Sequence, residues 1–306
     1  MAVVPGDGHR RRALHPWPPS GRSPGENIMG IVTETPQVPP GVDPTKPSPA
    51  RMYDYVLGGK HNFPVDREAA ERIRAQAPDL EDAAWVNRAF HQRAARWMAA
   101  EQGVRQFLDI GSGLPTQGNT HGIVQGVAPE AHVVYVDIDP MVRAYASELL
   151  ADDGTTAVIT ADLRQPDTVL NDPELRRLID FDEPVGLLIT AVVHFVADDA
   201  DPWALVARYV GALAPGSYVA LSHATYDRLP PSLVQASTEV YAQAAADWYP
   251  RPRAEVERLF TGLQIVPPYE GADPAVTHLG VWGAEDPGLA DSDGSHWWYG
   301  AVGRRS

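Results

Sequence analysis

Short apolar runs alternate with amphipathic segments from about residue 105 to the end of the chain. Valine, isoleucine and leucine dominate these runs, which predicts strands at 106–110, 132–137, 156–161, 185–193, 217–222, 263–266 and 297–302. Apolar residues recur at helical spacing between them, at 116–128, 140–151, 167–179, 202–213 and 253–260. Strands that alternate with helices predict an α/β fold with a doubly wound, mostly parallel sheet. We expect the last two strands to form an antiparallel edge hairpin.

The chain before residue 105 has a different pattern. Residues 1–46 are rich in proline and arginine and contain no patterned segment, which predicts disorder. For residues 1–28, one interpretation is a basic tail; the one we favour is upstream sequence translated from a start codon assigned too early, with Met29 as the ordinary start. Residues 47–104 are predicted to be helical, with helices at 66–76 and 80–102. Residues 105–306 carry the predicted sheet.

The composition narrows the classes of function. The 25 Lys and Arg against 40 Asp and Glu give a net charge of −15, which repels the phosphates of nucleic acids. No apolar run approaches the roughly 18 residues of a membrane helix. The absence of cysteine fits a reducing cytoplasm, and the ten histidines show no paired helical spacing. We expect a cytoplasmic protein that binds neither nucleic acid nor a membrane, and no metal.

A glycine motif follows the first strand of the predicted sheet. It reads Asp109-Ile110-Gly111-Ser112-Gly113-Leu114-Pro115-Thr116. Glycines at a strand-to-helix turn let the backbone approach a ligand, although a tight turn without a ligand has the same signature. A dinucleotide-binding loop carries a third glycine where Thr116 stands, which weakens a nicotinamide interpretation. Asp109 suits S-adenosylmethionine, which carries an amino group and a sulfonium cation.

Acidic residues also follow the second and third strands. Asp137 at the tip of the second strand can accept both hydroxyls of a ribose, and Ile138 offers an apolar edge to a purine. Asp139 precedes Pro140, which is typical of a helix N-cap. After the third strand, Asp162 can receive the adenine amino group beside the apolar Leu163. Acids at three successive strand tips favour an adenosyl ligand more strongly than any one of them does.

These motifs resemble those of class I S-adenosylmethionine-dependent methyltransferases. From about Pro47 to Arg304 the chain is similar to a bacterial family of S-adenosyl methyltransferases long catalogued as a domain of unknown function. The matching residues are the glycine motif, Asn87-Arg88, Asp66 and the run Arg51-Met52-Tyr53-Asp54-Tyr55-Val56-Leu57-Gly58-Gly59-Lys60-His61-Asn62-Phe63. The resemblance implies a Rossmann-like, seven-stranded sheet with an antiparallel last strand and S-adenosylmethionine as cosubstrate. It implies no particular methyl acceptor, and the Trp-rich segment 282–298 does not match.

The segment before the sheet is expected to form a lid over the cofactor. A helix that ends at Leu57 and stops at Gly58-Gly59 explains the paired glycines structurally. In the functional interpretation, Lys60 or Arg51 meets the methionine carboxylate. The residues that we assign to the cofactor from this segment are Tyr53, Gly59, Lys60, Asn62 and Phe63. The alternative for an exposed lysine is simple solvation.

Two histidines near the carboxyl ends of the fourth and fifth strands are candidates for catalysis. The fourth strand runs through Thr190, which we assign to the cofactor, to His194. His223 follows the fifth strand and is the second candidate. A base is needed only if the acceptor must lose a proton, and a packed histidine bonded to backbone is the alternative for His194.

These observations predict a bacterial, cytoplasmic S-adenosylmethionine-dependent methyltransferase that acts on a small molecule. One alternative is a sensor or interaction protein that binds S-adenosylmethionine or S-adenosylhomocysteine without transferring a methyl group. A more remote alternative is an NAD(P)-dependent oxidoreductase.

Overall fold

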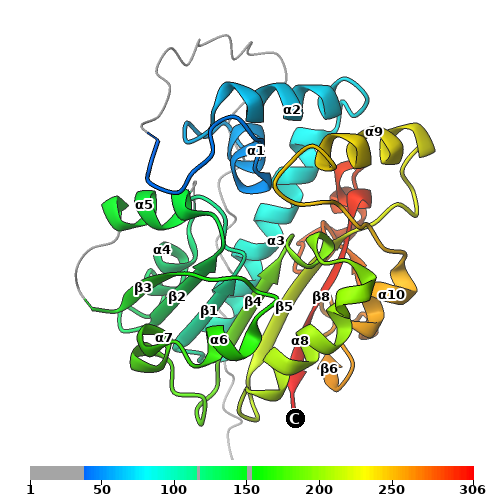
Figure 1. The fold of residues 1–306 in the computed structure, drawn as a ribbon. Helices are drawn as coiled ribbons and strands as arrows, with labels where there is room; N and C mark the ends of the chain where they lie inside the picture. Colours follow the sequence, from blue (N-terminus) through cyan, green and yellow to red (C-terminus); the bar gives the residue numbers. More distant parts are fainter. Residues whose placement is uncertain (1–37, 116–117, 150–153) are drawn as a thin grey trace, which may run out of the picture. The chain divides into compact units, whose positions relative to one another are not determined.

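The strands form one mixed sheet (Figure 1). The computed structural model describes residues 38–115, 118–149 and 154–306. Within them the strand order is β3-β2-β1-β4-β5-β8-β6, and β7 pairs with β8. The bounds are β1 Gln106–Ile110, β2 His132–Asp137, β3 Thr156–Thr160, β4 Gly186–Thr190, β5 Tyr218–Ala224, β6 Leu263–Ile265, β7 Thr277–His278 and β8 Trp298–Arg305. Strands β1 to β5 are parallel, which confirms the predicted α/β fold.

The predicted antiparallel hairpin lies at the edge of the sheet. β8 pairs antiparallel with β6, as expected for the hairpin, and it also pairs along the whole of β5. It therefore lies inside the sheet, and the three-residue β6 lies at the edge. A Cβ at Gly300 would lie 2.4 Å from the carbonyl oxygen of Leu221, and one at Gly303 would lie 2.9 Å from Cβ of Leu263. Glycine at both positions lets the neighbouring strands approach on both sides.

Eight of the described α-helices begin on a proline. Proline suits the first helical position because its fixed φ is already helical and its missing N–H has no partner there. The bounds are α1 Pro49–Val56, α2 Pro64–Arg74, α3 Leu80–Ala100, α4 Thr120–Gln125, α5 Pro140–Leu149, α6 Pro166–Leu170, α7 Pro173–Leu178, α8 Pro202–Gly211, α9 Pro231–Tyr241, α10 Arg253–Arg258 and α11 Pro287–Ala290. Short 3₁₀-helices occupy η1 Val193–Phe195, η2 Asp198–Ala200 and η3 Gly294–Trp297.

The predicted helices differ from the structure most clearly at 167–179 and at α9. The single helix expected at 167–179 is divided into α6 and α7, because Pro173 cannot donate a backbone hydrogen bond and Asp172 caps a new helix. The Asp172 carboxylate accepts from Glu174 N at 2.8 Å and from Leu175 N at 3.4 Å. α9 is a helix that the sequence pattern did not indicate, because its Ser, Thr and Val residues have low helix propensity. This helix packs against α2.

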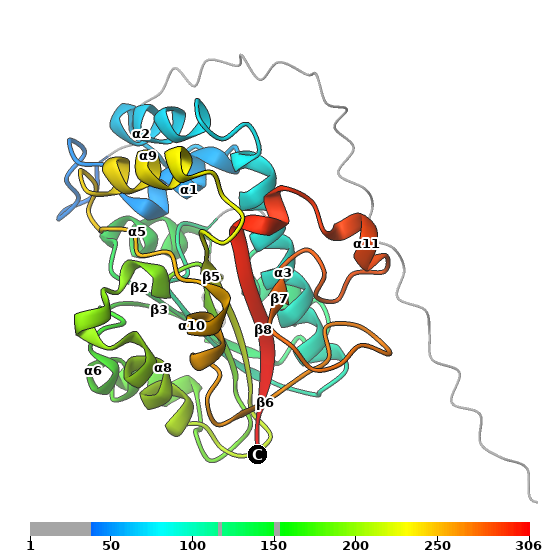
Figure 2. The ribbon, with the colours of Figure 1, turned by 90° about the vertical axis from the view of Figure 1, so that its right-hand side faces the viewer.

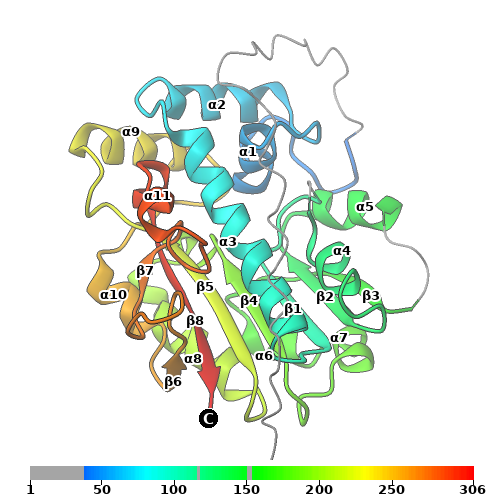
Figure 3. The same cartoon turned by 180° about the vertical axis from the view of Figure 1, so that it is seen from behind.

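Helices cover both faces of the sheet. Leu108 and Ile110 of β1 pack on one face with apolar side chains of α6, α7, α8 and α10. Phe107 of the same strand packs on the other face with Phe90 and Met98 of α3. Figure 3 shows α3 running along this second face. Successive residues of a strand point to opposite faces, so one buried strand supplies both cores.

Three helices lie together over the carboxyl ends of the parallel strands. Figures 1 and 2 show α1, α2 and α9 in this position. α3, which we predicted as part of a helical lid at 47–104, instead packs against β4, β5 and β8. The described parts of 47–104 and 105–306 belong to one compact unit. The predicted disorder of 1–46 falls mostly outside the described residues. Separately, none of the helices described has the length and hydropathy needed to span a membrane.

Candidate active site

A glycine turn follows β1 at the carboxyl end of the sheet. Gly111 and Gly113 have φ angles of +68° and +67°, in the left-handed region that favours glycine. A Cβ at Gly111 would lie 2.3 Å from Cγ2 of Val192, so the turn after β4 packs directly on this glycine. A Cβ at Gly113 would meet no atom within 4 Å. The backbone at Gly113 therefore borders open space that a ligand can enter.

Asp137, at the tip of β2, holds this turn. Its Oδ2 accepts a hydrogen bond from Gly113 N at 2.8 Å, and its Oδ1 accepts one from Asp139 N at 2.9 Å. Burial raises the pKa of Asp137 to about 6. The neighbouring Ile138 is 57% exposed. Each carboxylate oxygen keeps a second lone pair, so an acceptor for hydroxyl groups lies next to a bare apolar side chain.

Asp109, at the tip of β1, belongs to a buried network. Thr120 Oγ1 donates to Asp109 Oδ2 at 2.6 Å. Because that hydroxyl proton is used, His91 Nε2–H donates to Thr120 Oγ1 at 2.8 Å and His91 Nδ1 accepts from Thr190 Oγ1 at 2.9 Å. Burial raises the pKa of Asp109 to about 6 and lowers that of His91 to about 3. A neutral His91 on α3 therefore links the tips of β1 and β4.

A small cavity opens beside Asp109. Arg88 of α3 is buried in its wall, and its Nη2 donates to Gly118 O at 3.0 Å and to Asn119 Oδ1 at 3.2 Å. The other lining residues are Asp109, Ser112, Gly113, Leu114, Pro115, Asn119, Thr120, His121, Tyr135 and Val142. The charge of Arg88 partly offsets the effect of burial on the pKa of Asp109. One cation and one acid thus face the same space.

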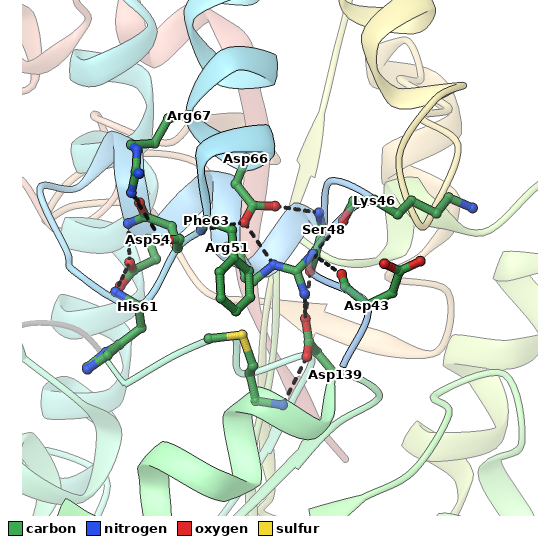
Figure 4. Close-up of polar contacts among 12 residues, drawn as sticks. Asp43, Lys46, Ser48, Arg51, Asp54, His61, Phe63, Asp66, Arg67 and Asp139 are labelled. Atoms are coloured by element: carbon green, nitrogen blue, oxygen red, sulfur yellow. Dashed lines mark hydrogen bonds and ion pairs between the residues drawn. The ribbon is translucent and has the colours of Figure 1, made fainter. Parts of the chain in front are cut away.

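Figure 4 shows a cluster of polar contacts, called the latch below, that joins the segment around α1 to the start of α5. Arg51 Nε donates to Asp66 Oδ2 at 2.9 Å, and Arg51 Nη1 lies 3.6 Å from Asp139 Oδ2. Ser48 Oγ donates to the same Asp139 oxygen at 2.7 Å, and Ser48 N donates to Asp66 Oδ1 at 2.9 Å. Since Asp139 lies two residues after Asp137, the latch fixes α1 and α2 close to that carboxylate.

A second, aromatic cavity lies beneath α1, α2 and α9. Its volume of about 60 Å³ is several times the roughly 10–15 Å³ that one water molecule requires. Apolar and aromatic side chains form most of its wall, and no Asp, Glu, Lys or Arg lines it. The lining residues are Met52, Tyr53, Val56, Ala70, Ile73, Leu80, Ala83, Ala84, His194, Ala224, Ser237, Tyr241, Trp248, Trp297 and Trp298.

His194 brings a polar ring into this aromatic cavity. Its Nδ1 accepts a hydrogen bond from Ala224 N at 3.4 Å, and Nε2 has no hydrogen-bond partner among the described residues. Burial, His223 and Arg251 lower the pKa of His194 well below its usual value. The ring is therefore neutral at physiological pH, and because Nδ1 accepts, Nε2 carries the proton.

His223 lies next to His194 but serves as a brace. Its Nδ1 donates to Ala224 O at 2.7 Å, and its Nε2 accepts from Arg251 Nη1 at 2.8 Å. Arg251 Nη2 also donates to Val196 O at 2.6 Å, on the segment that follows His194. Burial lowers the pKa of His223 to about 3. Both ring nitrogens are used within the protein, so neither remains for an acceptor molecule.

The turn between β4 and η1 borders both the glycine turn and the aromatic cavity. Ala191 has a φ of +53°, which is unusual for a residue other than glycine. Val192 packs on Gly111, and His194, two residues later, lines the aromatic cavity. The two regions therefore meet at this turn.

Comparison with known proteins decides the family. A family model described as S-adenosyl methyltransferase matches residues 35–306. The chain belongs to this family. It is 39% identical to a protein of Thermobifida fusca classed provisionally as a methyltransferase, with a TM-score of 0.79 over 88% of this chain and 98% of that one. It is also 39% identical to a duf574 family protein of Streptomyces avermitilis, with a TM-score of 0.78 over 85% of this chain and 98% of that one.

Membership of the S-adenosyl methyltransferase family confirms the activity and the cofactor predicted from the sequence: the protein is a methyltransferase that uses S-adenosylmethionine. These matches give no support to a non-catalytic sensor or to an NAD(P)-dependent oxidoreductase. No protein with a curated description matches the sequence. The residues at the sheet edge fit an adenosyl ligand, because Gly113 borders open space and Asp137 stands beside the bare Ile138.

The structure places the other predicted cofactor residues in three settings. Tyr53 lines the aromatic cavity, and Phe63 is buried against the side chains around Leu114. Gly59 and Asn62 surround Asp54: a Cβ at Gly59 would lie 2.0 Å from Asp54 Oδ1, and Asn62 Nδ2 donates to Asp54 Oδ2 at 2.8 Å. The structure therefore does not bring these four residues together at the carboxyl ends of β1 and β2.

The remaining predicted residues lie near the surface. Lys60 is exposed. Asp162 pairs with Arg164 at 2.7 Å, and the half-buried Leu163 accepts a hydrogen bond from Tyr209 through its carbonyl oxygen. Arg51, the other residue expected at the methionine carboxylate, is committed to the latch.

Sequence reasoning missed three residues of the site: Arg88, His91 and Ser237. Arg88 had a signal, because Asn87-Arg88 belongs to the family signature. His91 and Ser237 had none, since each is an ordinary polar residue within a helical segment. Their places in the site depend on the packing of α3 on the sheet and of α9 on α2.

We expect Asp109→Asn to change how stability depends on pH. A carboxyl whose folded pKa is raised from 3.8 to about 6 stabilises the protein fully below pH 4, and that contribution is lost as the pH rises through 6. Asparagine carries no such proton. Between pH 4.5 and 7, the variant's unfolding free energy should improve relative to wild type by on the order of 1–3 kcal/mol, measured by urea denaturation. The exposed Asp273→Asn is the control, and parallel curves for Asp109→Asn and wild type would contradict the expectation.

Proposed function

We propose that the protein methylates a small molecule held in the aromatic cavity, with S-adenosylmethionine bound along the carboxyl ends of β1 and β2. The observation that carries this proposal is the turn after β4. Val192 in that turn touches Gly111, and His194 lines the aromatic cavity. Donor and acceptor sites that share one short turn suit direct transfer between two bound molecules.

Each part of the cofactor has a matching group at the sheet edge. Asp137 accepts hydrogen bonds from the ribose hydroxyls, and Ile138 covers one face of the adenine. The glycine turn leaves room for the methionine portion of the cofactor. The amino group of that portion is held near Asp109 and Thr190. Arg88 meets the methionine carboxylate, because a buried guanidinium faces the cavity that Asp109 and Gly113 line. Asp162 and Leu163 border the adenine edge more weakly, since Arg164 already binds Asp162.

S-adenosylmethionine supplies an electrophilic methyl group on a sulfonium. The protein aligns the acceptor and excludes water, and the apolar walls of the aromatic cavity suit both tasks. His194 donates its Nε2–H to a heteroatom of the acceptor and so orients it. As the bond from this heteroatom to the methyl carbon forms, the carbon–sulfur bond breaks, the positive charge passes to the acceptor, and the methylated acceptor then releases its proton to solvent. With Nδ1 accepting from Ala224 N, the neutral ring holds its proton at Nε2 and acts as a positioning group rather than as a base.

The small-molecule acceptor is tested with methyl-deuterated S-adenosylmethionine. The protein is incubated with a bacterial extract divided into a small-molecule filtrate, a protein fraction and an RNA fraction. We expect S-adenosylhomocysteine to form with the filtrate and the deuterated methyl group to appear there by mass spectrometry. Label in the protein or RNA fraction would overturn the small-molecule acceptor. Failure to bind S-adenosylmethionine in calorimetry would overturn the cofactor site.

With the labelled filtrate compound as acceptor, His194→Ala should lower kcat/KM by roughly 10- to 100-fold, which is the size of effect expected when one contact that positions the acceptor is lost. The affinity for S-adenosylmethionine should stay within about twofold of wild type, because His194 faces the other cavity. His132→Ala, at the amino end of β2, is the control. A parallel loss of cofactor affinity would indicate that His194 supports the cofactor site instead.

A further inference from the structure

The polar tips of several aromatic residues in the second cavity are already bonded within the protein. Trp297 Nε1 donates to Asp79 Oδ2 at 2.6 Å, and Trp298 Nε1 donates to Ala83 O at 2.8 Å. The Tyr53 hydroxyl donates to Ala84 O at 2.9 Å. These three side chains therefore offer the cavity mainly the apolar faces of their rings. Flat rings are the surfaces against which another ring packs.

Ser237 is the exception. It lies on α9, is 1% exposed and lines the aromatic cavity, yet its Oγ has no hydrogen-bond partner among the described residues. A helical serine can donate to the carbonyl four residues earlier, and the next residue, Thr238, does so to Val234 O at 2.8 Å. A buried hydroxyl without a partner lowers stability. Ser237 is thus a buried hydroxyl still to be satisfied in a mostly apolar cavity, which also contains the Nε2–H of His194.

Charge further restricts what can occupy this cavity. No acidic or basic side chain lines it, and His194 is neutral because its pKa is well below the usual value. An ionised group buried there would lose its hydration without gaining a partner. A cationic acceptor would also be repelled by the positively charged methyl donor that the proposed function places nearby.

We infer that the acceptor is a neutral, flat aromatic molecule that bonds to Ser237 through one hydroxyl or carbonyl group. This inference rests on the proposed function, since it assigns the acceptor of that same site. The rings of Trp297 and Trp298 pack against the acceptor, Ser237 holds one polar group, and His194 orients the atom that is methylated.

Calorimetry with surrogate ligands tests this assignment. The protein is first saturated with S-adenosylhomocysteine, and that binding is recorded separately. The probes are 2-naphthol, naphthalene, the saturated analogue 2-decalol, the anion 2-naphthoate and the cation trimethylphenylammonium. We expect 2-naphthol to bind at least tenfold more tightly than the decalol and the two ions. Equal or tighter binding of an ion or of the decalol, or no binding of 2-naphthol, would overturn the inference.

Ser237→Ala isolates the hydrogen bond. The variant should bind 2-naphthol about five- to tenfold more weakly and naphthalene within twofold of wild type, because only the naphthol offers a partner. Ser232→Ala, an exposed serine of the same helix, should change neither affinity. Equal changes for both probes, or none for 2-naphthol, would contradict a role for Ser237. If S-adenosylhomocysteine itself fails to bind, the proposed function fails, whereas loss of the naphthol result alone removes only the acceptor class.

Discussion

Replacing Arg251 with methionine should lower the free energy of unfolding by about 2–6 kcal/mol, because two buried acceptors lose their hydrogen-bond donor and each such loss costs about 1–3 kcal/mol. The guanidinium is 3% exposed and connects β5 to the segment that carries His194. Its Nη1 donates to His223 Nε2 at 2.8 Å, and its Nη2 donates to Val196 O and to Asp198 Oδ1, both at 2.6 Å. Methionine fills part of the volume but leaves His223 Nε2 and Val196 O buried without a donor.

Urea denaturation and thermal melting measure this effect. For a domain of this size the loss corresponds to a fall in Tm on the order of 10 °C. Arg253→Met is a matched control, because Arg253 lies on the surface and pairs with Glu257 at 2.8 Å. Exposed pairs of this kind contribute about 0–1 kcal/mol. If Arg251→Met destabilised the protein no more than Arg253→Met, the inference that the hydrogen bonds of Arg251 stabilise the fold would be wrong.

The parallel part of the sheet could be predicted because its strands are buried on both faces. Continuous apolar runs such as 132–137 and 185–193 are typical of buried parallel strands in a chain where strands alternate with helices. The place of β8 could not be predicted in the same way. Its pairing with β5 joins residues about 80 positions apart, and Gly300, which lets β5 approach, has no side chain that would indicate a neighbouring strand.

The candidate site likewise has one part that could be predicted from the sequence and one part that could not. Asp109 and Asp137 were brought together in the prediction because the carboxyl ends of neighbouring parallel strands converge. The aromatic cavity could not be predicted, because residues far apart in the sequence form its wall. The Trp-rich segment 282–298 had no assigned role from the sequence, yet Trp297 and Trp298 line the aromatic cavity. His223 followed the predicted strand 217–222, a position that suggested chemistry, but it lies within β5 and Arg251 donates to the ring nitrogen that chemistry would need.

Asp137→Ala should weaken S-adenosylmethionine binding at least about 100-fold in calorimetry. Under the proposed function this carboxylate accepts hydrogen bonds from both ribose hydroxyls, and hydrogen bonds to a charged group contribute about 1.5–3 kcal/mol each. The substitution also releases Gly113 N and Asp139 N, which orient the glycine turn. Asp182→Asn, an exposed acid before the amino end of β4, is the control and should bind normally.

The pH dependence of binding separates the charge of Asp137 from its shape. With a folded pKa of about 6, Asp137 is ionised at pH 7 and becomes protonated as the pH falls through 6. Wild-type affinity should therefore weaken between pH 7 and 5, because protonation removes the negative charge that favours the donated hydroxyl protons. Asp137→Asn keeps the shape without the titration, so its weaker affinity should vary less over this range. Any slope that remains should disappear in the double variant Asp109→Asn/Asp137→Asn, since Asp109 titrates in the same range. An Asp137→Asn curve parallel to that of wild type would show that the ribose carboxylate lies elsewhere.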